Sequence, residues 1–239
     1  MPEELHDGLL DRLAACFEPD AIKTLDTASF SGEHVFEALH FSWYNRHCTE
    51  GHGAPLDTPP MTLKRTAGIK TNYHQFIPYP SKDMIGAGKK SIYQSVKNIL
   101  GPVFDWLEGK LKDMLPEMYE HLEAYVRILP GNNQAVGEPF LGLVININVA
   151  TAAHRDSKDD SVCLVLAVGD FEGGDLVLYE PGLVFSMRNG DFIVFPSCKL
   201  THFNLHYKGR RASIVLHTDK EMGKWLVDRN GWSCNSTFV

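Results

Sequence analysis

The 239-residue chain has few cysteines and no long apolar run. Its five cysteines are odd in number and widely spaced, and none belongs to a C-x-x-C pair. We therefore expect reduced thiols, and we expect neither a disulfide framework nor a zinc ribbon. No apolar stretch approaches the ~20 residues of a membrane span. The acidic start, MPEELHDGLLDRL, is unlike a secretion signal. We therefore expect an intracellular protein with no membrane partner.

Several signatures of other enzyme classes are also missing. The sequence contains no G-x-S-x-G, no P-loop, no H-E-x-x-H and no zinc-deaminase pattern. Hydrophobic residues make up 44% and charged residues 22% of the chain, which excludes disorder, collagen and coiled coil. The length suits one domain of about 200–250 residues, as in many β-barrels and sandwiches. We expect one domain over 1–239, and the sequence leaves its oligomeric state open.

Positive charge is concentrated in one stretch of an acidic chain. The formal net charge is −7, yet residues 61–100 hold seven Lys or Arg residues against Asp83 alone. Aromatic residues lie among them at Tyr73, Phe76, Tyr79 and Tyr93. Such a stretch is typical of a surface that contacts DNA or RNA. A solvated basic face that balances acidic neighbours would have the same composition.

The first 135 residues are expected to be mainly helical. Val35, Phe36, Leu39 and Trp43 keep a helical spacing. Pro102 and Pro116 each suit the first position of a helix, so two further helices are predicted to begin there. No motif in this part identifies a chemistry.

The pattern changes to short strands after residue 136. Residues 141–150 (LGLVININVA) alternate apolar and polar faces. About eight short strands follow each other with tight turns between them, and Asn189-Gly190 favours a hairpin. The expected fold class is α+β, with a sandwich or barrel core over 136–220, N-terminal helices packed against it and a tail at 221–239.

Three residues of this half form a metal-ligand pattern. His154 and Asp156 are two apart, so an imidazole and a carboxylate share one face of an extended segment. His202 follows 48 residues later in another candidate strand. Two histidines and one carboxylate with open positions are the facial triad of non-haem Fe(II) oxygenases. On its own, His202 would be interpreted as a hydrogen-bonded core histidine.

Four further residues could hold a small acidic co-substrate. Arg211 and Ser213 share a strand face, and a guanidinium fork can grip a distal carboxylate. Asn146 and Asn148 lie on the polar face of the strand before His154. Either could bond a carboxylate or a metal ligand, or could simply satisfy the strand end. His217 is six residues after Arg211 in the same expected strand, so the two side chains are on the same face. His217 either lines the pocket or has a purely structural role.

Taken in their order along the chain, these motifs resemble those of a known family. The pieces are His154/Asp156, Gly169 to Leu176, Gly190 to Phe195, Leu200 to Asn204 and Gly209 to Ser213. Together they are similar to the 2-oxoglutarate/Fe(II)-dependent dioxygenase superfamily, and within it most similar to the TET/JBP-like branch. That family folds as a double-stranded β-helix, which is a jelly roll. The resemblance implies that His154, Asp156 and His202 bind Fe(II). It also implies that Arg211 binds the C5 carboxylate of 2-oxoglutarate with help from Ser213, and that Asn146 or Asn148 takes part.

The resemblance also implies an activity. The chain would use O2 and 2-oxoglutarate to hydroxylate a C–H bond, with release of succinate and CO2 and with ascorbate as a reductant. The branch oxidises the methyl group of 5-methylcytosine or thymine in nucleic acid, which would place the protein in the nucleus. A hydroxylase or demethylase of a small metabolite or protein side chain, placed in the cytoplasm, is the alternative. A non-catalytic jelly-roll binding module is a third hypothesis.

Overall fold

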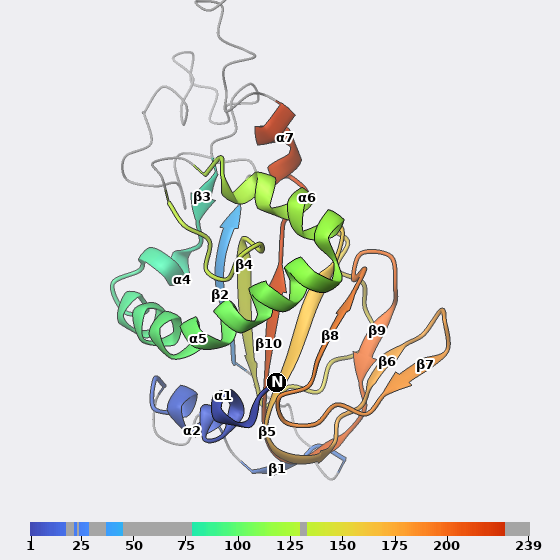
Figure 1. Cartoon of the computed structure of the whole chain (residues 1–239). Coiled ribbons are helices and arrows are strands. Elements are labelled where there is room, and N and C mark those ends of the chain that lie inside the picture. The colour runs from blue at the N-terminus through green and yellow to red at the C-terminus, as the bar shows by residue number, and fades with distance from the viewer. Residues whose placement is uncertain (18–21, 23, 29–36, 45–77, 130–132, 228–239) are drawn as a thin grey trace, which may run out of the picture.

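The computed structural model describes residues 1–17, 22, 24–28, 37–44, 78–129 and 133–227. Its centre is a seven-stranded antiparallel sheet in the order β3-β2-β4-β10-β5-β8, with β1 paired to β10 (Figure 1). The strands of this larger sheet are β1 Leu25–Asp26, β2 Glu37–Tyr44, β3 Tyr79–Pro80, β4 Gly142–Ile147, β5 Cys163–Gly173, β8 Phe192–Phe195 and β10 Tyr207–His217.

A smaller sheet and a group of helices cover the two faces of the larger sheet. The smaller sheet has the order β7-β6-β9, with β6 Leu176–Leu178, β7 Leu183–Phe185 and β9 His202–Asn204. The helices are α1 Glu3–His6, α2 Leu9–Ala14, α4 Lys82–Ile85, α5 Lys90–Met114, α6 Pro116–Val126 and α7 Met222–Val227. Among the described residues, no helix is long and apolar enough to cross a membrane.

Strand periodicity divides the apolar residues between two cores. Successive residues of a strand point to opposite faces, so Leu164 and Leu166 of β5 join the core under the helices. Cys163, Val165 and Ala167 face the smaller sheet. In β10, likewise, Ile214 and Leu216 face the helices. The opposite face of β10 carries Ser213 and His217 together with the apolar Val215.

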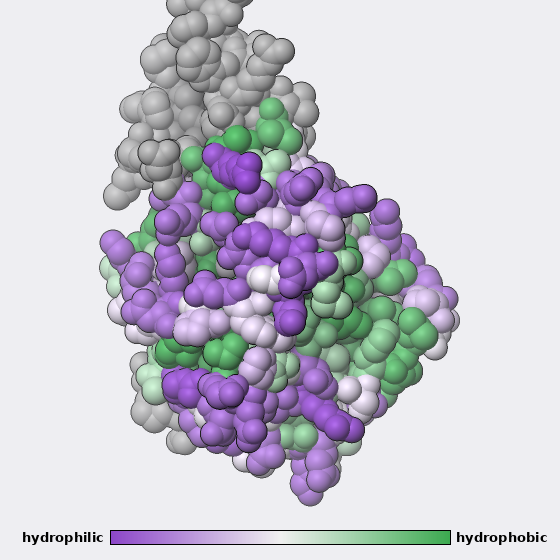
Figure 2. Space-filling model, in the orientation of Figure 1, coloured by the Kyte–Doolittle hydropathy of each residue, from purple (hydrophilic) through white to green (hydrophobic). Residues whose placement is uncertain are grey.

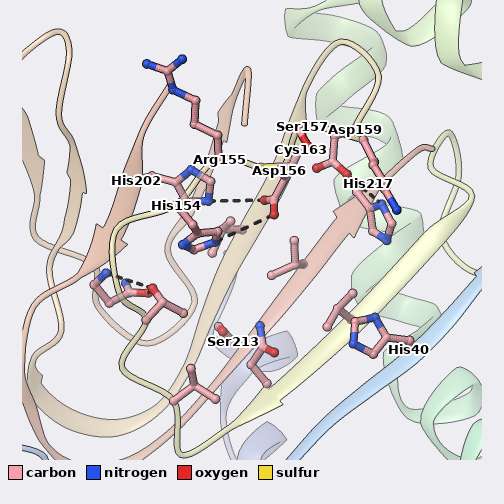
Figure 3. Close-up of a pocket in the computed structure, with 18 of the residues that line it drawn as sticks. His40, His154, Arg155, Asp156, Ser157, Asp159, Cys163, His202, Ser213 and His217 are labelled. Carbon is pink, nitrogen blue, oxygen red and sulfur yellow. Dashed lines mark hydrogen bonds and ion pairs between the residues drawn. The ribbon is translucent and has the colours of Figure 1, made fainter. Parts of the chain in front are cut away.

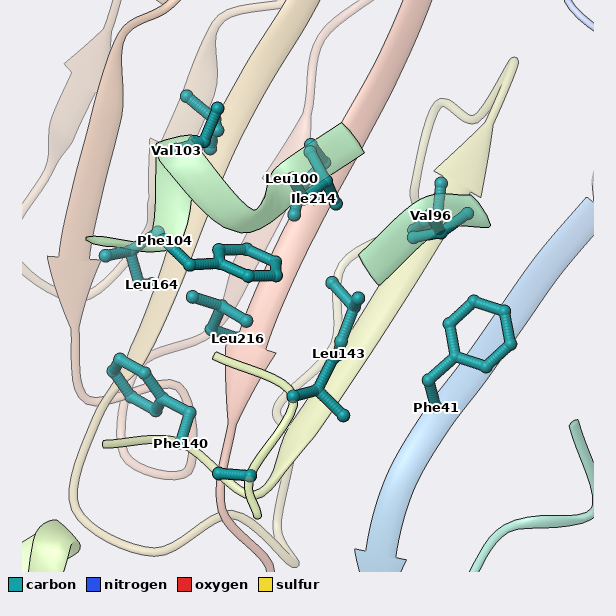
Figure 4. Packing of buried hydrophobic residues seen from close by; sticks show 14 of the residues in the cluster. Phe41, Val96, Leu100, Val103, Phe104, Phe140, Leu143, Leu164, Ile214 and Leu216 are labelled. Atoms are coloured by element: carbon teal, nitrogen blue, oxygen red, sulfur yellow. The ribbon is translucent and has the colours of Figure 1, made fainter. Parts of the chain in front are cut away.

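The long helix α5 closes the first core. Its buried residues recur at helical spacing and lie over β4 and β10, where they meet Leu143, Ile214 and Leu216 (Figure 4). The buried stripe of α5 is Tyr93, Val96, Leu100, Val103, Phe104, Leu107 and Leu111. This packing holds the larger sheet rigidly from behind.

The prediction of a helix over Val35–Trp43 is wrong for its described part. Residues 37–44 form strand β2, which pairs with β4 through Leu39↔Ile145 and Phe41↔Leu143. Leu39, Phe41 and Trp43 are all buried. These three residues alternate along the sequence as in a strand, but the spacing of Leu39 and Trp43 also fits a helix. Pairing with β4 selects the strand. Val35 and Phe36 lie outside the described residues.

One of the two proline predictions is also wrong. Helix α6 begins at Pro116 as expected, but α5 runs through Pro102. A proline in a helix interior loses one backbone hydrogen bond and costs about 3 kcal/mol. Leu100 and Val103, on either side, are buried in the core. Their burial favours continuation of the helix across this position.

Asn189-Gly190 does not close a hairpin either. It connects β7 to β8, and β7 pairs with β6 whereas β8 pairs with β5. The turn therefore carries the chain from the smaller sheet to the larger one. The hairpin lies earlier, between β6 and β7, where Leu178 pairs with Leu183. Exposed apolar side chains at Leu183 and Val184 lie on this hairpin, on the side where Figure 2 shows a concentration of apolar surface.

Candidate metal centre and co-substrate pocket

A cavity of about 470 Å³ lies between the two sheets. Its walls are the polar face of the larger sheet, strands β6 and β9, and the segment 149–159 that connects β4 to β5. The volume is within the range of about 300–1,000 Å³ typical of ligand pockets. All three predicted metal ligands line this cavity.

His154, Asp156 and His202 come together at the cavity wall. Asp156 Oδ1 lies 3.9 Å from His154 Nε2, and Asp156 Oδ2 lies 3.4 Å from His202 Nε2 (Figure 3). One ligand atom from each residue lies within 4.8 Å of the other two. The three side chains can therefore meet one metal ion.

Both imidazoles are held with Nε2 toward the aspartate. His154 Nδ1 lies 2.7 Å from the carbonyl of Ala152, and His202 Nδ1 lies 3.0 Å from the carbonyl of Leu200. A carbonyl can only accept, so Nδ1 of each ring carries a proton, and in the neutral imidazole Nε2 keeps the lone pair that a metal ion needs. Such carbonyl partners orient metal-binding histidines in proteins.

The protonation equilibria show that the cluster attracts positive charge. Burial raises the pKa of Asp156, but the hydrogen bond with His202 and the nearby imidazoles of His154, His202 and His217 together outweigh it, so the pKa of Asp156 is lowered. Burial lowers the pKa of His202, but the hydrogen bonds with Asp156 and with the carbonyl of Leu200 and the charges of Asp156 and Asp159 together outweigh it, so the pKa of His202 is raised. Two imidazoles and one carboxylate suit Fe(II).

Arg211 is a buried cation with free hydrogen-bonding capacity. Its side chain is 2% exposed, and its Nε has no hydrogen-bond partner. The guanidinium lies 5.3 Å from the ring centre of Phe171 and 5.7 Å from that of Tyr207. Burial lowers its pKa. Within the described residues it forms no ion pair with a carboxylate, so an acidic ligand would satisfy it.

The other predicted co-substrate residues are placed differently from one another. Ser213 and Asn146 line the cavity and are paired across β10 and β4. Arg211 lies just behind the cavity wall, where its Nη1 donates to the carbonyl of Val149 at 3.5 Å. Asn148 does not line the cavity. It has a φ of +60°, and its N–H donates to the carbonyl of Arg211.

One polar pair of the pocket wall was not predicted as a pair. Asp159 Oδ1 lies 3.2 Å from His217 Nδ1, and Ser197 Oγ donates to Asp159 Oδ2 at 2.7 Å. His217 Nε2 lies 3.3 Å from Ser42 Oγ. The parity of β10 indicated that His217 could face the pocket. The role of Asp159 could not be predicted from the sequence, because its position depends on how the chain folds back after Asp156.

The basic stretch 61–100 only partly falls within the described residues. Tyr93 is 8% exposed and packs on Phe41, with ring centres 5.1 Å apart, so it is a core residue and cannot stack on a base. Lys89 pairs with Asp83 at 3.3 Å. Residues 61–77, with Tyr73 and Phe76, lie outside the described part of the chain, and the side chain of Tyr79 is not described either.

The sequence matches the Tet_JBP family, the oxygenase domain of the 2OGFeDO superfamily, over residues 72–220. The chain belongs to this family. The predicted TET/JBP-like branch and the predicted cofactors, Fe(II) and 2-oxoglutarate, are thereby confirmed.

Similar proteins agree with this assignment. Thymine dioxygenase JBP1 of Trypanosoma brucei brucei is 31% identical over 115 residues, which is 47% of this chain and 13% of that protein. Thymine dioxygenase JBP1-A of Trypanosoma cruzi (strain CL Brener) is 31% identical over 105 residues, 43% of this chain and 12% of that protein. The chain thus matches about an eighth of the length of these relatives.

A solved structure shares the fold. NgTET1, determined in complex with 5mC DNA, superposes with a TM-score of 0.60 and 13% sequence identity, over 93% of this chain and 72% of that one. The predicted α+β class with a jelly-roll core is confirmed by this likeness and by the two facing antiparallel sheets.

Proposed function

We propose that the chain is an Fe(II)/2-oxoglutarate-dependent dioxygenase that oxidises the methyl group of a 5-methylpyrimidine in DNA. The meeting of His154, Asp156 and His202 at the wall of a 470 Å³ cavity carries the proposal. Iron and 2-oxoglutarate together supply the oxidation of a C–H bond by O2, with release of succinate and CO2. We also propose that 1–239 acts as one oxygenase domain, and that an enzyme with this substrate works in the nucleus.

The chain's own residues have distinct tasks in this proposal. The two imidazoles and Asp156 would hold the metal through Nε2, Nε2 and a carboxylate oxygen. Arg211 would donate to the distal carboxylate of 2-oxoglutarate, since its Nε lacks a partner. Ser213 and Asn146 line the same cavity as the three candidate metal ligands and would bond the same molecule.

The substrate proposal rests on the relatives and on the cavity. JBP1 is named a thymine dioxygenase, and NgTET1 was determined with 5mC DNA. A base inside a duplex cannot reach such a cavity, so the target nucleotide must leave the stack. The polar pair Asp159 and His217 lies on the wall that a base entering the cavity would meet.

The test is succinate formation from 2-oxoglutarate with Fe(II) and ascorbate in air. The assay is run with 5-methylcytosine DNA, thymine-containing DNA lacking 5-methylcytosine, and no DNA, beside a His202→Ala control. We expect succinate to rise with a methylated substrate, to vanish in the variant and to fall at high salt, because DNA binding releases counterions.

Other results would redirect the proposal. Slow succinate formation that DNA does not stimulate would keep the oxygenase and reject the DNA substrate, in favour of a metabolite or protein side chain. No succinate from folded, iron-loaded protein would favour the non-catalytic binding module.

A further inference from the structure

The two segments that carry the candidate ligands have an outer side as well as an inner one. His154 and Asp156 face the cavity, and Arg155, between them, extends away from the three ligands (Figure 3). Thr201 directly precedes His202. The backbones of His154 and His202 pair with each other, so Arg155 and Thr201 are brought close on the outer side. Their side chains meet there: Arg155 Nε donates to Thr201 Oγ1 at 3.0 Å.

Glu180 joins these two residues from a third segment. Its Oε1 accepts from Arg155 Nη2 at 2.5 Å and from Thr201 Oγ1 at 2.6 Å, and its Oε2 accepts from the backbone N–H of Thr201 at 2.7 Å. Every donor of this cluster is one residue away from a candidate metal ligand. We refer to Arg155, Glu180 and Thr201 as the outer clamp.

Glu180 itself is anchored to the smaller sheet. It lies in the hairpin turn that follows β6, and the N–H of the preceding Tyr179 donates to the carbonyl of Thr201 at 2.9 Å. Beside it, Leu178 of β6 pairs with His202 of β9. The hydrogen bond from Thr201, followed by that from Arg155, lowers the pKa of Glu180 to about 2. The carboxylate is therefore charged under all working conditions, which strengthens each bond that it accepts.

The outer clamp is exposed to solvent, so its contribution to overall stability is expected to be small. Its geometry is more informative than its energy. One carboxylate binds the side chain of Arg155 and both the hydroxyl and the backbone N–H of Thr201, and these two residues are direct neighbours of His154, Asp156 and His202 in the sequence.

We propose that Glu180 is a positioning residue that holds the two ligand-bearing segments at the spacing the metal requires. This inference rests on the proposed metal site. Partners outside the ligand set typically change metal affinity by 10–100-fold when they are removed. Glu180→Gln keeps the shape of the side chain and removes its charge, so it should weaken metal binding without unfolding the protein.

The experiment uses Co(II) alone, added to metal-free protein. Affinity is measured by competition with a coloured chelator, and the ligand-field spectrum of bound Co(II) reports the geometry of its ligands. Glu172→Gln is the matched control, because Glu172 is an exposed carboxylate at the end of β5 with no hydrogen bond or ion pair to described residues. We expect Glu180→Gln to bind Co(II) at least about 10-fold more weakly than Glu172→Gln, with a changed spectrum and an unchanged melting temperature.

Several outcomes would overturn the inference. Wild-type affinity and spectrum in Glu180→Gln would do so, as would equal weakening in both variants, which would indicate a general effect of charge. Should Glu180→Gln fail to fold, Thr201→Val tests the same clamp by removing one hydroxyl, and an unchanged Co(II) spectrum there would reject it. Co(II) binding that survives in His202→Ala would instead reject the proposed metal site.

Discussion

His154 and His202 are joined through their backbones as an antiparallel bridge. The N–H of His154 donates to the carbonyl of His202 at 3.1 Å, and the N–H of His202 donates to the carbonyl of His154 at 2.9 Å. Their rings consequently lie side by side, with centres 4.3 Å apart. Two candidate ligands that are 48 residues apart in sequence are thereby placed opposite each other by backbone pairing.

The first prediction concerns the candidate ligands. Asp156→Ala and His154→Ala should each reduce iron-dependent succinate formation at least about 100-fold, beyond the 10–100-fold typical of residues that only support a ligand. The cluster consists of these three side chains, so no other member can replace a ligand that is removed. Succinate is measured together with bound iron. Iron-dependent turnover that persists in both variants would refute the site assignment.

A second prediction concerns the buried guanidinium. Arg211→Met should weaken 2-oxoglutarate binding at least about 10-fold, equivalent to about 1.4 kcal/mol. The melting temperature of the metal-free protein should not fall, because the change removes an unpaired buried charge and keeps an apolar stem between two rings. Calorimetric titration of the Ni(II)-loaded protein measures the affinity.

Arg210→Met is the matched control for this change. Arg210 is the next residue of β10, and its guanidinium pairs with Asp11 at 2.9 Å on the outside of the molecule. Its loss should leave 2-oxoglutarate affinity unchanged. Equal affinities in the two variants would show that Arg211 does not hold the co-substrate.

A third prediction concerns Gly142. A Cβ at this position would lie 2.7 Å from Cδ2 of His217, and the ring cannot move freely because Asp159 and Ser42 hold its two nitrogens. Gly142→Ala should therefore cost about 1–3 kcal/mol of unfolding free energy, as is typical of overpacking.

The partner mutation separates this clash from a general effect on β4. In a His217→Ala background the cost of Gly142→Ala should fall below about 1 kcal/mol, since contacting residues are not additive. Urea unfolding of the four proteins measures the coupling. If the free-energy costs of the two mutations simply add, the His217 ring does not cause the cost of a side chain at position 142.

A fourth prediction is a dependence on alkaline pH. Burial, and then the bond from Tyr119 to Glu108 at 2.8 Å, raise the pKa of Tyr119 to about 12. An unfolded tyrosine ionises near pH 10. The resulting stabilisation is therefore complete below about pH 10 and is lost as the pH rises through 12. Urea unfolding of wild type and Tyr119→Phe across this range should show a steeper loss in the wild type, and parallel curves would contradict the assignment.

Much of the site was predictable because strand periodicity is a local property. The spacing of His154 and Asp156 placed both on one face, and the parity of β10 placed Ser213 and His217 on the cavity side. The same rule could not distinguish Asn146 from Asn148. A positive φ at Asn148 breaks the alternation at the end of β4, and that backbone change depends on contacts with β10.

The errors in predicting the fold have a common cause. Leu39 and Trp43 fit both a helix and a strand, and only the partner β4 selects the strand. Pro102 is a favourable first helical residue, yet burial of residues on both sides carries α5 through it. Asn189-Gly190 can form a tight turn, but which strands it joins depends on the pairing of β7 and β8 with different sheets.

The sequence by itself determined the fold class, the cofactor chemistry and the three candidate metal ligands, because motif order and period-two alternation are properties of the chain. The tertiary structure decided what lies around them. It buried Arg211 without an acidic partner, paired Asp159 with His217, and brought Glu180 against Arg155 and Thr201. These contacts join segments that are far apart in sequence, so they exist only once the two sheets have packed face to face.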